Sequence, residues 1–528
     1  MTNSIEDIEE AKSFLVIGSN TTETHPVIGY RVRRARKRGA SLIVADPRRI
    51  RLAEDADVHL QLRPGTNTAL LLGLAKVILD EKLYAEDFVK EQCDGFEEYA
   101  ASLKKVDLKE TAEITGVPED KLVKAARIYA SNNPSTILYA MGITQHSQGT
   151  DNVLALASLA MLTGNLGKRG GGVNPLRGQN NVQGACDMAA LPNVLPGYQP
   201  VTSPEARKKF EDAYGTEIPG SPGLAMTEMF DAAKSGDLKA LYVMGENPLM
   251  SEAHTSKVKE ALSKIDFLVV QDIFLTETAA YADVVFPSAS FAEKDGSFVN
   301  TERRVQRIRK AINPPGKAKC DLTIISEIAR GIGLNGFSYS GPEEVMEEIT
   351  TLLPKWKGIT YERLENGGLC WPCPDDDHPG TPILYTDKFL RSNGKALFKP
   401  VEFRQPKELA DDEYPFILTT GRVLYHYHTG TMTRKVEGLN SLQDREKVWL
   451  SIEDANNLGI GEGDQVRVSS RRGEVLAEAY PSEAMAEGVV FMTFHFAEAC
   501  VNELTNTAAD PVAKIPELKV GAVNIESA

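Results

Sequence analysis

The most constraining feature of the chain is a recurring short apolar run that ends in a small or polar residue and leads into a helical pattern. Four such runs lie near the start of the sequence, at 14–20, 41–48, 58–65 and 135–144. Between them, residues 27–38 and 68–81 carry apolar side chains at helical spacing. Continuous apolar strands that alternate with helices predict a parallel sheet covered on both faces.

A second set of such runs follows a stretch rich in glycine, proline and asparagine at 164–200. Its members are 240–248, 267–278 and 283–290. After 415–422, the segment 448–496 contains short alternating strands broken by turns, which predicts a small β-barrel. We therefore expect an α/β fold with two doubly wound, Rossmann-like units and a C-terminal β-barrel.

The expected domain boundaries follow from these patterns. A length of 528 residues corresponds to three or four domains at about 150 residues each. The pattern loosens between the second α/β set and the barrel, so we expect connecting and flanking structure there. The predicted division is a first α/β domain at 1–178, a second at 179–292, a connecting segment at 293–406 and a barrel at 407–528.

Charge and composition exclude several classes of protein. With 74 acidic and 59 basic residues the net charge is -15, which argues against a broad nucleic-acid surface. The basic run 31–38 falls on a predicted helix, where a solvated helix face is the favoured interpretation. No apolar run reaches the length of a membrane helix. Six scattered cysteines and no visible export signal predict a reducing compartment, the cytoplasm.

Small and polar residues gather where the predicted strands end. In a parallel sheet these ends present backbone amides and short polar side chains to ligands, and acidic residues there bind ribose hydroxyls or guanine edges. Turns also favour glycine, asparagine and aspartate, so each stretch alone has a simpler explanation. Their succession favours a ligand that carries nucleotides. The stretches are Gly18-Ser19-Asn20-Thr21, Asp46-Pro47-Arg48, Gly65-Thr66-Asn67, Gly245-Glu246-Asn247-Pro248 and Gln271-Asp272.

Two common nucleotide sites are disfavoured. The one G-x-G-x-x-G match, 331–336, follows the helical pattern 322–330 instead of a strand, so we interpret it as a helix C-terminus. The phosphate-binding pattern G-x-x-x-x-G-K-[ST] is absent from the sequence. A conventional NAD site and a simple nucleoside triphosphatase are therefore not expected.

The most unusual stretch is 177–185, which reads RGQNNVQGA. A single arginine, Arg177, stands among carboxamides and glycines. Its guanidinium can donate two hydrogen bonds to a carboxylate or oxyanion, and the neutral amides around it add no competing charge. A polar turn with a surface arginine is the alternative interpretation.

These residues resemble a known family. The chain is similar over essentially its whole length to the molybdopterin-containing large subunit of formate dehydrogenases, within the dimethyl sulfoxide reductase family. The stretch RGQNNVQGACDM carries the most specific part of the resemblance. Other matching stretches are 18–20, 43–48, 142–145, 160–168, 243–249, 271–274, 287–288, 420–422 and 425–433.

The resemblance implies a cofactor and a reaction. It implies a bis(molybdopterin guanine dinucleotide) that holds molybdenum or tungsten, oxidation of formate to carbon dioxide, and electron transfer to an iron–sulfur or flavin subunit. By position, Arg177 is the catalytic residue that orients formate, and Gln179 lies beside the pterin. The remaining cofactor-binding residues are Gly18, Asn20, Asp46, Arg48, Gly65, Asn67, Gly142, Gln145, Gly245, Glu246, Gln271, Asp272, Asp321, Arg422, His426, Thr433, Asn502 and Lys519.

The sequence departs from the family in the residues that bind metal. Relatives of this kind begin with a four-cysteine 4Fe-4S domain and carry a selenocysteine or cysteine ligand to the metal. No metal ligand is expected among the residues of this chain, since the lone Cys370-Trp-Pro-Cys373 lacks a second pair. Our hypothesis is that Met1 is an internal methionine, downstream of a selenocysteine codon that was read as a stop. The chain alone is then expected to be inactive.

Other interpretations stay open at this point. His426, with Tyr425, Tyr427 and His428 beside it, fits an aromatic packing cluster as well as a ligand role. A related molybdopterin oxidoreductase, such as a nitrate reductase, has the same fold. A non-catalytic scaffold of an electron-transfer complex is the third possibility. The sequence does not choose between hydride and proton removal from formate.

Overall fold

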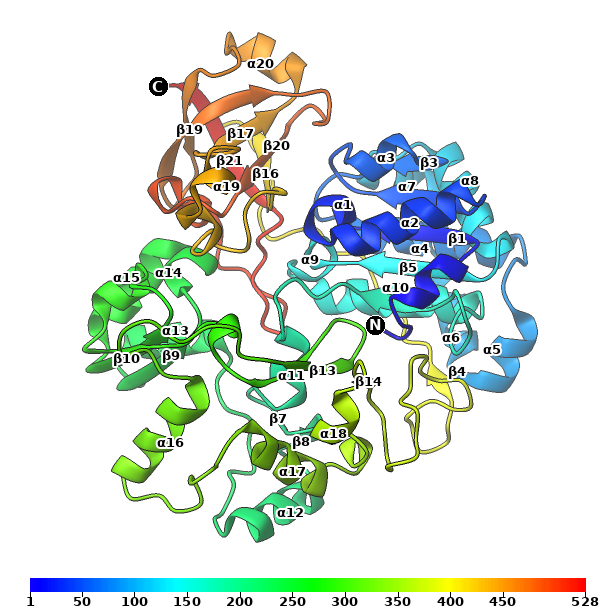
Figure 1. Cartoon of the computed structure of the whole chain (residues 1–528). Helices are drawn as coiled ribbons and strands as arrows, with labels where there is room; N and C mark the ends of the chain where they lie inside the picture. Colours follow the sequence, from blue (N-terminus) through cyan, green and yellow to red (C-terminus); the bar gives the residue numbers. More distant parts are fainter. The chain divides into compact units, whose positions relative to one another are not determined.

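The first sheet consists of five parallel strands and forms the centre of the amino-terminal region. The computed structural model describes residues 1–528, and the strand order is β3-β2-β1-β5-β6. Figure 1 labels β1, β3 and β5 of this sheet. Because β1 lies between β2 and β5, the strand order reverses at β1 and β5. Their bounds are β1 (Ser13–Ile17), β2 (Ser41–Ala45), β3 (Val58–Leu60), β5 (Ser135–Tyr139) and β6 (Val173–Pro175).

Alternate residues of the central strand fill two separate cores. Phe14 and Val16 belong to a cluster with residues of α2, whereas Leu15 and Ile17 pack with residues of α4, α8 and α10. Every residue of β1 is buried, which confirms the parallel sheet covered on both faces. The helices of this region are α1 (Thr21–Thr24), α2 (Pro26–Lys37), α3 (Arg51–Glu54), α4 (Asn67–Asp80), α5 (Glu86–Gln92), α6 (Phe96–Leu103), α7 (Leu108–Thr115), α8 (Glu119–Ser131), α9 (Met141–Thr144) and α10 (Gly149–Leu162).

The second predicted α/β set forms a three-stranded parallel sheet in the order β11-β10-β9. Val243, Leu268 and Val270 of this sheet pack with Phe230 and Leu262 of the flanking helices. The elements are β9 (Ala240–Met244), β10 (Phe267–Asp272), β11 (Val284–Pro287), α13 (Met226–Ser235), α14 (Pro248–Ser251) and α15 (Thr255–Lys264).

The segment expected to be connecting structure contains an ordered sheet of its own. Its strands are antiparallel, and Val305 packs there against Trp356, Tyr361 and Cys373. Strands of only two to five residues carry little periodicity, which is why the sequence patterns missed them. The elements of this segment are β12 (Gly296–Val299), β13 (Arg304–Ile308), β14 (Leu369–Cys370), α16 (Asp321–Gly331), α17 (Pro342–Leu352) and α18 (Tyr361–Leu364). Earlier in the chain, between the two parallel sheets, lie α11 (Val182–Asp187), β7 (Val194–Leu195), β8 (Gln199–Pro200) and α12 (Pro204–Tyr214).

The carboxyl-terminal region is a closed six-stranded barrel in the order β16-β20-β17-β19-β18-β21. The predicted barrel is thus confirmed, with β21 as a further strand that the sequence patterns did not indicate. Its core contains apolar residues such as Leu418, Val448, Val466, Val490 and Val523. The elements are β16 (Phe416–Gly421), β17 (Lys447–Leu450), β18 (Gln465–Ser469), β19 (Glu474–Pro481), β20 (Val489–Thr493), β21 (Gly521–Ser527), α19 (Glu437–Asn440) and α20 (Ile452–Leu458).

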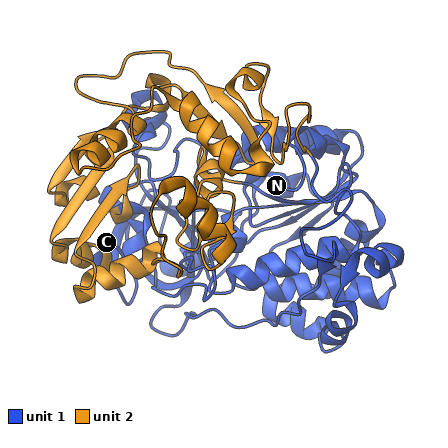
Figure 2. Cartoon of the chain, turned by 90° about the horizontal axis from the view of Figure 1, so that it is seen from below, with its two compact units in different colours: residues 1–176, 250–256, 383–528 blue, residues 177–249, 257–382 orange.

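The chain divides into two compact units, which Figure 2 distinguishes by colour. Unit 1 combines residues 1–176, 250–256 and 383–528, and unit 2 combines 177–249 and 257–382. The first sheet and the barrel therefore belong to one unit. The four-domain division made from the sequence stays a prediction.

Cys93 begins a short strand, and the basic run 31–38 lies on a helix. α5 ends at Gln92, and the next residue, Cys93, begins β4 (Cys93–Asp94), which pairs with β15 (Ala396–Leu397). The basic run forms most of α2, and its arginines make ion pairs with Glu9, Asp55 and Asp57. None of the helices combines the length and the apolar character that a bilayer crossing requires.

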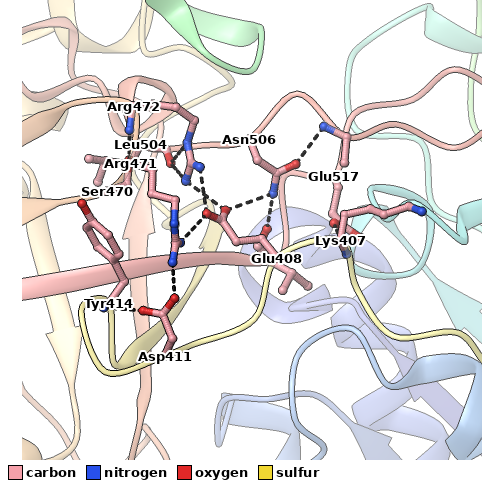
Figure 3. Close-up of polar contacts among 12 residues, drawn as sticks. Lys407, Glu408, Asp411, Tyr414, Ser470, Arg471, Arg472, Leu504, Asn506 and Glu517 are labelled. Carbon is pink, nitrogen blue, oxygen red and sulfur yellow. Dashed lines mark hydrogen bonds and ion pairs between the residues drawn. The ribbon is translucent and has the colours of Figure 1, made fainter.

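Polar contacts attach the segment before the barrel to the barrel itself (Figure 3). Glu408 accepts hydrogen bonds from both terminal nitrogens of Arg472, at 2.8 and 2.9 Å, and from Arg471 at 3.0 Å. Arg472 also donates to the carbonyl oxygen of Leu504, at 2.8 Å from Nη2. Asn506 donates to the carbonyl of Val520 at 2.9 Å, next to β21. These contacts hold the segment before β16, through Glu408, and the segment before β21, through Asn506, against the barrel.

Two carboxylates join the barrel region to the amino end of α10. Asp510 accepts hydrogen bonds from the backbone N–H and the hydroxyl of Thr150, at 2.9 and 2.7 Å. Glu517 accepts from the N–H and the hydroxyl of Ser147, at 3.0 and 2.6 Å. Since the amino end of a helix carries a partial positive charge, both contacts are electrostatically favourable.

We predict that Asp510→Asn lowers the free energy of unfolding by about 1–3 kcal/mol, because both carboxylate oxygens accept from Thr150 and an amide can accept at only one. Burial raises the pKa of Asp510, but hydrogen bonds from Thr150 and Ala513 outweigh it and leave the pKa below its usual value. The stabilisation is therefore present at neutral pH and lost as the pH falls through the lowered pKa.

Urea unfolding at pH 7 and at pH 3 measures this difference. The control is Asp412→Asn, which changes an exposed aspartate of the same unit. Equal midpoints for Asp510→Asn and the control at pH 7 would contradict the prediction.

Candidate functional site

Gly18 and Gly142 meet at the point where the strand order of the first sheet reverses. They follow β1 and β5, and the N–H of Gly142 donates to the carbonyl oxygen of Gly18 at 3.1 Å. A Cβ on Gly18 would lie 2.6 Å from the backbone of Gly142, and a Cβ on Gly142 would lie 2.6 Å from Gly18. In open α/β sheets, ligands bind in the crevice beyond the strand ends at such a reversal.

Polar residues surround this pair of glycines. Asn20 is buried, and its carbonyl oxygen accepts from the N–H of Thr24 at 2.9 Å. The side-chain nitrogen of Asn67, the first residue of α4, lies 3.2 Å from Nε2 of His146 and 3.5 Å from the Gly142 carbonyl, and Nε2 of His146 donates to that carbonyl at 2.8 Å. Burial lowers the pKa of His146 to about 4, so the ring is neutral at pH 7.

The remaining sequence-predicted residues of this edge differ in their contacts. Gln145 directly follows α9 and is partly exposed. Gly65 has a φ of +85°, and a Cβ there would lie 2.4 Å from the ring of Pro406. Gly65 is therefore required by close packing against the segment that leads to the barrel.

Asp46 and Arg48 follow β2 and point toward the barrel. Oδ1 of Asp46 accepts from the backbone N–H of Arg48 at 3.0 Å. The Arg48 guanidinium carbon lies 3.6 Å from the centre of the Phe491 ring, on β20. Burial raises the pKa of Asp46 although Arg48 opposes this shift, and it lowers the pKa of Arg48. Sequence reasoning missed Phe491, because a buried barrel aromatic looks the same whether or not a cation stacks on it.

Two further cations lie in the same electrostatic environment. Lys519 is buried and donates from Nζ to the carbonyl oxygen of Thr420 at 2.7 Å. Burial lowers the pKa of Lys519 to about 7, and the positive charges of Arg422 and Arg48 contribute to the shift, whereas Asp46 opposes it. We call Arg48, Arg422 and Lys519 the cation cluster.

The cation cluster fits the diphosphate of a dinucleotide. Asp46 interacts with both Arg48 and Lys519, and Glu23 interacts with Arg48. Three basic side chains thus face two carboxylates, so an excess of positive charge remains in a largely buried place. Buried charges are costly unless they are paired, and a bound diphosphate supplies the missing negative charge.

His426 lies in a ring cluster close to Arg422. Its Nδ1 is 3.2 Å from the hydroxyl of Thr433, and its Nε2 is 2.7 Å from the Gln443 carbonyl. Its ring contacts those of His495 and Phe496. His495 accepts from the N–H of Val423 at 3.1 Å, and burial lowers its pKa to about 3. His426 therefore contacts Thr433, which the resemblance also assigns to the cofactor, and it takes part in aromatic packing.

Asn502 is part of a structural contact within unit 1. Its side-chain amide donates to the carbonyl oxygen of Met250 at 2.8 Å, and the residue is buried. If Asn502 binds the cofactor, its side-chain amide does so while it also donates to the Met250 carbonyl.

In unit 2, the strand ends of the second parallel sheet carry another polar cluster. Gln271, at the end of β10, is fully buried and donates to Asp321 at 2.6 Å. Asp321 also accepts from Ser288 at 3.0 Å and pairs with Lys294. Burial raises the pKa of the neighbouring Asp272. Acceptors that converge here can bind the hydroxyls or amines of a nucleoside.

Gly245 and Glu246 lie beside this cluster, after β9. Gly245 has a φ of +62°, and its Cβ position faces open space. The N–H of Gly245 donates to the carbonyl oxygen of Gln271 at 2.8 Å, which ties the two strand ends together. Glu246 is partly exposed. The open space at Gly245 permits close approach of a ligand to the backbone.

Arg177 opens the loop of unit 2 that contains the carboxamides. Its backbone N–H donates to the hydroxyl of Thr301 at 3.0 Å, and its Nε donates to Oε1 of Gln183 at 3.3 Å. Gln179 is partly exposed in the turn before α11. No group of three or more histidine, cysteine, aspartate or glutamate side chains in the 528 residues is arranged to hold a metal ion.

Comparison with protein families gives two matches. The family described as Molybdopterin oxidoreductase matches residues 1–331, and the Molydopterin dinucleotide binding domain matches residues 416–522. The second match spans β16 to β20 of the barrel and includes Lys519.

Individual relatives cover the whole chain. The F420-dependent formate dehydrogenase subunit alpha of Methanocaldococcus jannaschii is 51% identical over all of this chain and 78% of its own length. Formate dehydrogenase H of Escherichia coli is 41% identical, over all of this chain and 74% of its own. Among solved structures, acetylene hydratase from Pelobacter acetylenicus aligns with a TM-score of 0.78 and 23% identity, over 100% of this chain and 79% of its own. This last likeness concerns the fold alone.

We predict opposite effects of Lys519→Met on stability and on anion binding. Without a ligand, the buried ammonium destabilises the fold at every pH below its unfolded pKa of 10.5. The cost is full below about pH 7 and disappears toward pH 10.5, so the variant should melt above wild type at pH 6 and equally at pH 10. Its affinity for pyrophosphate should fall by at least about tenfold.

Thermal melting and calorimetric titration with inorganic pyrophosphate test both effects on the same chain. Lys105→Met, which changes an exposed lysine, is the control. A variant that melts below wild type at pH 6, or that binds pyrophosphate equally well, contradicts the assignment of Lys519 to the cation cluster.

Proposed function

We propose that this chain, which belongs to the molybdopterin oxidoreductase family, is the cofactor-binding part of a formate dehydrogenase catalytic subunit. The observation that carries this proposal is the position of Arg177, whose guanidinium is held through Nε by a neutral amide. Formate dehydrogenase subunits with 41 to 51% identity to the whole chain support it. The proposed reaction is oxidation of formate to carbon dioxide.

The residues of unit 1 are proposed to bind the cofactor. A molybdenum or tungsten ion in a bis(molybdopterin guanine dinucleotide) supplies the two-electron oxidant when bound. The cation cluster binds a diphosphate, and the backbone contact between Gly18 and Gly142 leaves room for the dinucleotide beyond the strand ends. In unit 2, Gln271, Asp272 and Asp321 are proposed to bind a nucleoside.

Arg177 is proposed to be the residue that binds formate. A guanidinium holds a carboxylate through two parallel hydrogen bonds, which fixes the plane of the substrate and the direction of its C–H bond. The carboxamides of the same loop hydrogen-bond without adding charge, so they do not compete with formate for Arg177.

Partners and location are proposed from the relatives and from the cysteines. Several relatives are named as alpha subunits, and three are F420-dependent. We infer that this chain acts with at least one further electron-transfer subunit and that coenzyme F420 is a candidate acceptor. The six cysteines are present as thiols and form no disulfide, which supports a reducing compartment such as the cytoplasm.

The direct test uses the enzyme purified from its natural source with its partner subunits. We expect molybdenum or tungsten near one atom per chain, and oxidation of formate with either an artificial dye or coenzyme F420 as acceptor. Nitrate reduction without formate oxidation would favour a different oxidoreductase. Absence of both metals, together with absence of pterin fluorescence after oxidation, would favour a scaffold.

We predict that Arg177→Lys in this enzyme lowers kcat/KM for formate by about 10- to 100-fold, because an ammonium cannot make the paired hydrogen bonds of a guanidinium. Steady-state kinetics with the dye measure the loss. Lys208→Arg, on the exposed face of α12, is the matched control and should leave kcat and KM for formate unchanged. Unchanged kinetics in Arg177→Lys would remove Arg177 from the proposed site.

A further inference from the structure

Gln183 lies between a cation and a carboxylate in unit 2. Its Oε1 accepts from Nε of Arg177 at 3.3 Å, and its Nε2 donates to Oδ1 of Asp187 at 2.7 Å. We propose that Asp187, acting through Gln183, is a positioning residue that orients the Arg177 guanidinium without neutralising it. This inference rests on the proposed function, since it assigns Arg177 to a carboxylate substrate.

The local sequence places the two members of this bridge together. Gln183 and Asp187 are four residues apart on α11, so their side chains lie on the same face of the helix. The start of α11 is fixed by Asn181, which has a φ of +61° and whose Oδ1 accepts from the N–H of Val299 at 2.9 Å. The bridge is thus attached to β12 through its own helix.

The environment of Gln183 determines which end of its amide faces Arg177. Its Nε2 is 2.7 Å from Asp187 and 3.1 Å from the hydroxyl of Tyr198, and both are acceptors for it. A carboxylate can only accept, so the amide nitrogen must face Asp187. The amide oxygen is therefore left to face the guanidinium, which can only donate.

Asp187 is itself fixed on its other side. Its Oδ2 accepts from the indole Nε1 of Trp371 at 2.7 Å, and an indole N–H can only donate. The residue is 1% exposed, and its carbonyl oxygen accepts from the N–H of Gly197 at 2.7 Å. Burial holds the pKa of Asp187 above its usual value, although hydrogen bonds from Gln183, Tyr198 and Trp371 and the charge of Arg177 oppose this shift. Because both oxygens accept from donors, the arrangement matches the ionised form.

The neutral amide of Gln183, which separates Arg177 from Asp187, affects how Arg177 can bind an anion. A carboxylate in direct contact with Arg177 would pair with it through two hydrogen bonds, and a substrate carboxylate would have to displace it. With Gln183 between them, Asp187 holds the arginine through an amide, and the positive charge stays available for an anion.

Gln183→Glu tests this role of the neutral amide, because the introduced side chain has the same shape but changes charge with pH. When protonated, the introduced carboxyl group can donate to Asp187 and accept from Arg177, as the native amide does. When ionised, it places a carboxylate on Arg177. We expect the ratio of variant to wild-type KM for formate to be near one at the acid end of the activity range. At the alkaline end it should reach at least about tenfold.

Two further variants distinguish loss of Arg177 orientation from a non-specific effect of mutation on the protein. Asp187→Asn removes the charge that orients Gln183, so we expect a higher KM with a ratio that does not vary with pH. Gln199→Glu makes the same chemical change beside Lys209, whose Nζ donates to Oε1 of Gln199 at 3.2 Å. We expect this control to have wild-type KM at every pH.

Binding of nitrate to the holoenzyme gives a readout that does not depend on turnover. Calorimetry should show the same pH-dependent loss of nitrate affinity in Gln183→Glu as the kinetics show for formate. Wild-type enzyme that oxidises formate, with a flat KM ratio in Gln183→Glu, overturns the positioning role alone. If wild-type enzyme does not oxidise formate, the proposed function fails, and the nitrate titration still decides whether Gln183 and Asp187 act on Arg177.

Discussion

The hydrogen bond from the N–H of Gly142 to the carbonyl oxygen of Gly18 is the contact on which the candidate site of unit 1 depends. It requires two turns to touch through bare backbone, since a Cβ on either residue would lie within 2.6 Å of the other. β1 and β5 end there at the same height, and Asn67 and His146 are arranged around the Gly142 carbonyl. A larger residue at either position would separate the strands at the point where the strand order reverses.

The second constraint is a group of positive side chains whose charge the neighbouring carboxylates do not fully neutralise. Many basic residues of the chain lie on the surface and pair with carboxylates, as those of α2 do. Arg48 and Lys519 instead share one buried carboxylate, Asp46, with Glu23 beside Arg48 and the further cation Arg422 beside Lys519. Such an arrangement lowers the stability of the protein alone and favours binding of an anion, so stability and function oppose each other here.

The predictability of the fold varied with the length of each pattern. The buried parallel strands were predictable because runs of consecutive apolar residues, as in β1 and β2, have few alternatives. β14 has only two residues, so it could not be recognised, whereas β21 carries the apolar and polar alternation of a strand over only a few residues, with Asn524 and Glu526 as its polar positions. In the site, glycines at strand ends were visible in the sequence. The contact between Arg48 and Phe491 was not, because only the tertiary fold brings these distant residues together.

The closed barrel also determines when the cation cluster can form. β16 pairs with β21 as well as with β20, and β18 pairs with β21. The strand that completes the ring is thus the last of the barrel strands to leave the ribosome, and Lys519 lies just before it. During synthesis, Asp46 and Arg48 are in place long before their partner lysine arrives. Cofactor insertion that requires all three cations must therefore follow translation of the barrel.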